Sequence, residues 1–60
     1  MKLQKLFIND QEIEVEINNN NSITITKHEY AQLIGDIVFY DNQIDAVIEL
    51  LQQAKKQLDK

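Results

Sequence analysis

Apolar and polar residues alternate in the first half of the chain. Ile13, Val15 and Ile17 are separated by single glutamates, and Ile23 and Ile25 repeat the alternation. A period of two is typical of a β-strand with one buried face. The pattern predicts strands over about 2–8, 12–17 and 22–26.

Turn-forming residues separate these strands. Asn9 and Asp10 lie in the first gap, and four consecutive asparagines occupy 18–21. Asn and Asp tolerate the left-handed backbone conformations that tight hairpins need. We therefore expect a three-stranded antiparallel meander, whose apolar face must be covered by residues 27–60.

A heptad pattern follows the meander. Thr26 and Glu29 have the spacing of a capping box at a helix start. Apolar or aromatic residues then recur at alternating spacings of three and four, which is typical of a helix with an oligomer interface. They are Tyr30, Leu33, Ile37, Tyr40, Ile44, Val47, Leu51, Ala54 and Leu58. The pattern keeps its phase across Gly35, so it predicts one helix over about 27–58 that dimerises through this seam.

A broken helix is the alternative. Gly35 would end a first helix as a C-cap, and Asp41 would cap a second one. The β-branched and aromatic run IVFY supports this alternative, because such residues have low helix propensity. In either form, the fold class is α+β, in a single domain over 1–60.

The size of the chain indicates self-association. A 60-residue domain buries only about 60% of its unfolded surface, so its core is marginal. The sequence has no cysteine and one histidine, His28, so we expect no disulfide, metal or other cofactor. Pairing with itself, as a homodimer or a tetramer, is the remaining means of stabilisation.

Charge and hydropathy narrow the expected partners. The six basic residues are opposed by ten acids, for a net charge of −4. This balance disfavours nucleic acid, which is bound through clustered Lys and Arg. No stretch approaches the roughly 18 apolar residues of a membrane span, and the apolar run near the start is too short for a signal peptide. A cytoplasmic protein is expected.

Two groups of residues are candidates for binding a partner. One is the row Glu12, Glu14 and Glu16, which could equally be a solvated strand face paired with Lys2 and Lys5. The other is Phe39, in the aromatic middle of the predicted helix. His28 lacks a nucleophile or second histidine at a recognisable spacing and is expected to face solvent. No catalytic residue is predicted, and we expect the protein not to be an enzyme.

The segment ITITKHEYAQLIGDIVF, residues 23–39, resembles one that is common in short phage and prophage proteins of low-GC Gram-positive bacteria. The matching residues are Thr26, Lys27, Glu29, Tyr30, Leu33, Ile34, Asp36 and Phe39. The resemblance implies a small accessory protein that acts by binding, often by blocking a host enzyme, regulator or defence system.

The expected function is therefore a non-enzymatic, acidic, homo-oligomeric protein-binding module, encoded by a phage and inhibiting a host protein. The acidic row or the aromatic middle of the helix would cover a site on the target. Two alternatives stay open: a coiled-coil assembly module, and a small dimeric DNA-binding regulator, which the net charge disfavours.

Overall fold

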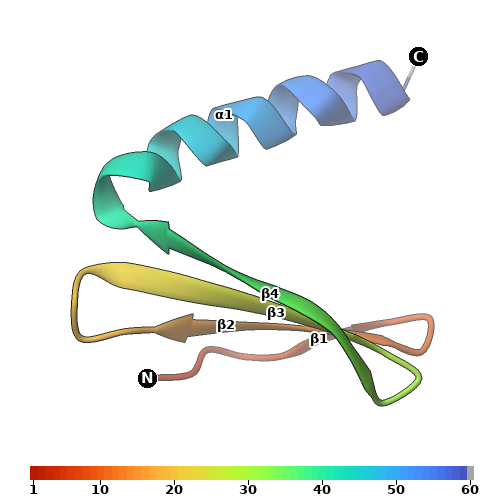
Figure 1. The fold of residues 1–60 in the computed structure, drawn as a ribbon. Coiled ribbons are helices and arrows are strands. Elements are labelled where there is room, and N and C mark those ends of the chain that lie inside the picture. Colours follow the sequence, from red (N-terminus) through yellow and green to blue (C-terminus); the bar gives the residue numbers. More distant parts are fainter. Residues whose placement is uncertain (60) are drawn as a thin grey trace.

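The computed structural model describes residues 1–59 and consists of an antiparallel sheet followed by one helix (Figure 1). The strands are β1 (Leu6–Ile8), β2 (Gln11–Ile17), β3 (Ser22–Glu29) and β4 (Gln32–Tyr40), and the helix is α1 (Asp41–Leu58). The strands lie in the sheet in their order along the chain, β1-β2-β3-β4. The α+β class and the antiparallel meander are confirmed, but the meander has four strands.

The predicted continuous helix over 27–58 is wrong in its first half. Residues 32–40 form β4, and Thr26 and Glu29, the expected capping box, both lie in β3. Ile37 and Phe39 also satisfy the alternation of a strand, and the β-branched and aromatic run favours a strand over a helix. Local β-propensity therefore prevails over the heptad spacing in this segment.

The hairpin between β3 and β4 turns at Tyr30 and Ala31. Both have positive φ values, 52° and 64°, as a two-residue type I′ turn requires. The β1–β2 turn has the same sign of φ at Asn9 and Asp10, which are residue types that suit it. Tyr30 donates its backbone N–H to the carbonyl of Asp10 at 3.0 Å, which links the two turns.

The N-terminal segment pairs with β2 beyond the short strand β1. Leu6 lies opposite Ile13, whereas Lys2 forms an isolated bridge with Glu16, so the pairing shifts by one residue between them. Leu3 donates its N–H to the carbonyl of Val15 at 2.9 Å. The strand predicted over 2–8 is therefore regular only in its second half.

Helix α1 begins directly after β4. Tyr40 is its N-cap residue, and the Tyr40 N–H donates to Gln43 Oε1 at 3.0 Å. Asp41 lies in the first turn and Lys55 and Lys56 in the last, where each charge favours the helix dipole. A helix start near Asp41, as in the broken-helix alternative, is correct, although Asp41 is not the cap itself.

The described residues contain no buried hydrophobic side chain. Ser22 is buried, at 2% exposure, at the end of β3 where the 18–21 loop closes. The Cα radius of gyration is 12.9 Å, larger than the roughly 10 Å of a compact chain of this length. Figure 1 shows why: α1 contacts the sheet near its start and then diverges from it.

Candidate protein-interaction surface

The two faces of the sheet differ sharply in polarity. Directly opposed residues of an antiparallel sheet have their side chains on the same face. The strand register therefore tells which face each residue is on, except in the irregular stretches. One side, here called the apolar face, carries Leu6, Ile8, Ile13, Val15, Ile17, Ile23, Ile25, Ile37 and Phe39. Toward the β1–β2 and β3–β4 turns the same side also carries Gln11, Lys27 and Glu29, of which Lys27 and Glu29 form an ion pair at 3.4 Å. This is the apolar face of the meander that the sequence predicts, extended by β4.

The apolar face is incompletely covered. Leu6, Ile8 and Ile37 are all more than half exposed, and Ile17 is 39% exposed. The other apolar residues that the central strands place on this face are half-buried. At the end of the sheet, a hollow of about 280 Å³ has Ile17 and Ile23 on one side and Ile44 on the other. α1 therefore rises on the apolar side of the sheet but covers only this end.

The helix carries a second apolar surface. We call it the helix stripe; it consists of Ile44, Val47, Ile48, Leu51, Ala54 and Leu58, whose spacing places them along one side. Ile44 and Val47 are half-buried at the start, whereas Leu51 is 62% and Leu58 83% exposed. The stripe becomes uncovered as α1 leaves the sheet.

The predicted seam is split by the fold. Its last five members, from Ile44 to Leu58, lie on the helix stripe. Tyr30 lies in the β3–β4 turn, and Leu33, Ile37 and Tyr40 lie in β4. Leu33 and Tyr40 pair with His28 and Ser22, on the polar side, whereas Ile37 is on the apolar face. A single stripe through all nine positions is therefore wrong.

The predicted partner-binding residues also divide between faces. Glu12, Glu14 and Glu16 lie on the polar side, in register with Thr24, Thr26 and His28 of β3. Phe39 pairs with Ile23 on the opposite, apolar face. These four residues do not form one site.

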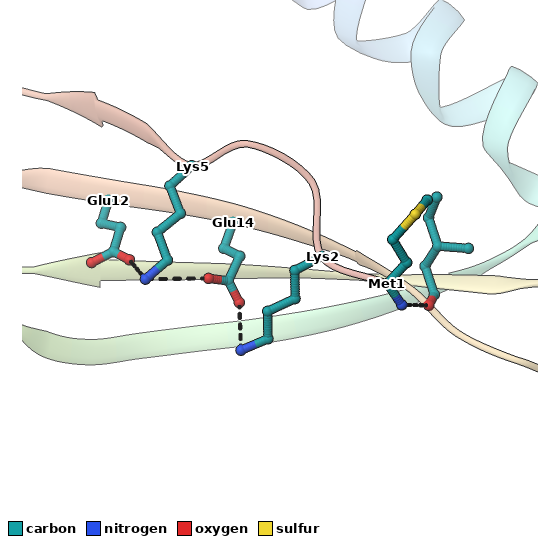
Figure 2. A network of polar contacts seen from close by, with 6 residues as sticks. Met1, Lys2, Lys5, Glu12 and Glu14 are labelled. Carbon is teal, nitrogen blue, oxygen red and sulfur yellow. Dashed lines mark hydrogen bonds and ion pairs between the residues drawn. The ribbon is translucent and has the colours of Figure 1, made fainter.

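Two lysines neutralise much of the glutamate row (Figure 2). Lys5 Nζ lies 2.9 Å from Glu12 Oε1 and 3.5 Å from Glu14 Oε2, and Lys2 Nζ lies 3.4 Å from Glu14 Oε1. The register shift described above brings both lysines to this face. The interpretation of the row as a strand face paired with Lys2 and Lys5 is confirmed for Glu12 and Glu14.

The network shifts two pKa values. Hydrogen bonding and charge from Glu12, and then from Glu14, raise the pKa of Lys5 above its usual 10.5. Partial burial acts to raise the pKa of Glu14, but the hydrogen bonds and charges of Lys2 and Lys5 outweigh it and lower this pKa below its usual 4.5. Both ionised forms are favoured in the fold.

His28 lies in β3 and not in a first helical turn. It is half-buried, opposite Glu12 on one side and Leu33 on the other. Its Nδ1 is covered and has no hydrogen-bond partner, so the expectation of a solvent-facing histidine is wrong. Within residues 1–59, no three His, Cys, Asp or Glu side chains are grouped so that they could hold a metal ion.

The outer edge of β4 is a feature that the sequence reasoning missed. β4 is an edge strand, paired with β3 on one side only. Leu33, Ile34 and Val38 are 56%, 56% and 48% exposed. The signal was present in the β-branched run, which favours a strand, but the turn before it lacks Asn and Gly.

Comparison with known proteins returns no match to a protein-family model, a curated protein or a solved structure. The fold and surface themselves define the class: an α+β protein with a four-stranded antiparallel sheet and one C-terminal helix. In the part of the chain that the structure describes, no helix has the length and apolar character needed to cross a membrane.

Proposed function

We propose that the protein is a non-enzymatic, homo-oligomeric protein-binding module whose apolar face and helix stripe are covered by other copies of the chain. One observation carries this proposal: among residues 1–59, no hydrophobic side chain is buried. Hydrophobic burial is the dominant favourable term in folding. A chain that leaves its apolar residues exposed as a monomer can gain the free energy of hydrophobic burial by associating with other copies.

The exposed area has the size that a dimer needs. The chain exposes 5280 Å², whereas a compact monomer of 7.0 kDa exposes about 4,000 Å² by the usual size scaling. The excess, roughly 1,300 Å² per chain, gives about 2,600 Å² for a pair of copies, within the range of obligate homodimers.

The apolar surfaces suit this role better than the glutamate row. Lys2 and Lys5 pair with Glu12 and Glu14, which weakens the field that a basic target would meet. Inhibition of a phage host protein, expected from the resemblance, stays a prediction, and the oligomer is the form that would meet such a target.

Thermal unfolding at several protein concentrations tests the proposal. If only the oligomer is stable, the melting temperature rises with concentration, because association is linked to folding. We expect a clear rise over about a hundred-fold range of concentration. A melting temperature independent of concentration would contradict the proposal.

A further inference from the structure

The two edges of the sheet are built differently. β1 has three residues. The segment before it pairs irregularly with β2 and carries Lys2 and Lys5. β4 has nine residues, with neither Lys nor Pro and with Asp36 as its one charged residue. Natural edge strands are protected by shortness, charge, Pro or irregularity. The β1 edge has this protection, and most of the β4 edge lacks it.

β4 also has the side-chain pattern of an interior strand. Ile37 and Phe39 lie on the apolar face, and Val38 and Tyr40 lie on the other. Strands that are apolar on both sides are typical of the middle of a sheet. Ile37 and Val38 are nevertheless 51% and 48% exposed. The sequence of β4 is thus typical of a strand inside a sheet, whereas β4 lies at the edge.

The backbone of β4 has hydrogen-bonding groups free for a partner strand. Asp41 donates its N–H to the carbonyl of Asn21 at 2.8 Å, and backbone groups alternate in direction along an antiparallel pair. The N–H and C=O of Asp36 and Val38 therefore point outward, away from β3. The Tyr40 N–H also points outward, but Gln43 Oε1 already accepts it.

We propose that two copies of the chain join through their β4 edges, antiparallel, around a two-fold axis at Ile37. Ile37 then lies opposite the partner's Ile37, Asp36 opposite the partner's Val38, and Gly35 opposite the partner's Phe39. The outward groups of Asp36 and Val38 are the ones that bond in this register. The proposal rests on the self-association proposed above and specifies its geometry.

Neighbouring registers are worse. A shift in one direction places Asp36 opposite the partner's Asp36, where like charges repel. A shift in the other places Gly35 opposite the partner's Asp41, which already lies in α1, so Gly35 no longer has the partner's Phe39 opposite it. In the proposed register, the space above Gly35, where a Cβ would meet nothing within 4 Å, is filled by the partner's Phe39. Aromatic residues opposite glycine are a known means of stabilising sheets.

The same axis arranges the helices favourably. A two-fold axis perpendicular to the joined sheet keeps both apolar faces on one side, the side from which α1 rises (Figure 1). Helices lying along that side then run antiparallel. Acidic residues occupy the first half of α1 and basic ones its last turn, so each acidic half would face the basic end of the other helix. Two copies of α1 and the joined apolar face would form one core.

A cysteine cross-link tests the register, because the chain has no cysteine of its own. Ile37→Cys places two thiols at the axis in a non-hydrogen-bonded pair, where opposed Cα atoms are about 4.5 Å apart, within the Cα range of a disulfide. Ile25→Cys is the matched control, because Ile25 shares the face but lies one strand inward. We expect rapid oxidation of the first variant to a disulfide dimer and little oxidation of the second.

Val38→Pro tests the ladder independently. It removes an outward N–H without touching the pairing with β3, whereas Val38→Thr keeps the N–H and the shape. We expect the proline variant to weaken dimerisation at least ten-fold with an intact β-sheet circular dichroism signal, and the threonine variant to dimerise normally. An oligomer that neither cross-links at 37 nor responds to Val38→Pro would overturn the β4 pairing alone. A wild-type chain that is monomeric would overturn both proposals.

Discussion

Tyr30 and Ala31 adopt a backbone conformation that few side chains favour. Their φ values of 52° and 64° lie in the left-handed region, which costs L-residues about 1–2 kcal/mol each. The hairpin forms nonetheless, because the long β3–β4 pairing provides more stabilisation than the left-handed turn costs. This is also why sequence reasoning missed the hairpin: the usual Asn-Gly signal is absent.

Ala31→Gly is therefore expected to stabilise the protein. Relief of the left-handed conformation outweighs the extra freedom of glycine in the unfolded chain, for a net gain of about 0.5–1 kcal/mol. Urea unfolding at a fixed protein concentration measures it. The control is Ala46→Gly, an exposed position in α1, which should lose about 1 kcal/mol; equal losses in both variants would show that the turn is unstrained.

The glutamate row responds to pH through Glu14. Its folded pKa is lowered, so its contribution to stability is present above pH 4.5, the usual pKa, and is lost as pH falls through the folded pKa. Lys5→Gln removes one cause of this shift. We expect a carboxyl NMR titration to show a higher pKa for Glu14 in that variant, and no change would mean that Lys5 does not interact with it in solution.

At the scale of elements, the sequence predicts the strands over 12–17 and 22–26. It also predicts the two turns beside them, which contain Asn9–Asp10 and the asparagines of 18–21. Alternation and turn chemistry act locally there. The segment 32–40 is ambiguous because Leu33, Ile37 and Tyr40 fit a helical spacing, while Ile37 and Phe39 fit a strand. Local β-propensity favours the strand, and pairing with β3 stabilises it further. That pairing is a tertiary effect, which the local pattern does not encode.

The helix stripe gives a prediction at this scale. Leu51→Glu introduces a charge in the middle of the stripe, whereas Leu50→Glu makes the same change at an adjacent residue, 63% exposed and off the stripe. We expect the first variant to weaken self-association at least ten-fold and the second to weaken it much less. Sedimentation velocity compares them, and equal effects would mean that the stripe is not the contact surface.

At the scale of the whole molecule, the apolar residues of the described chain lie at its surface and do not form a buried core. The sequence predicts the apolar face and its need for a cover, and residues 27–60 are long enough to supply one. The structure uses nine of those residues for β4 and directs α1 away from the sheet. The chain therefore presents two apolar surfaces where a compact monomer would have one core.

The solution mass of the chain tests this account most directly. Sedimentation equilibrium across a range of concentrations should give a dimer of about 14 kDa from the 7.0 kDa chain, because obligate dimers have no stable folded monomer. A stable folded monomer of 7.0 kDa at all concentrations would contradict it.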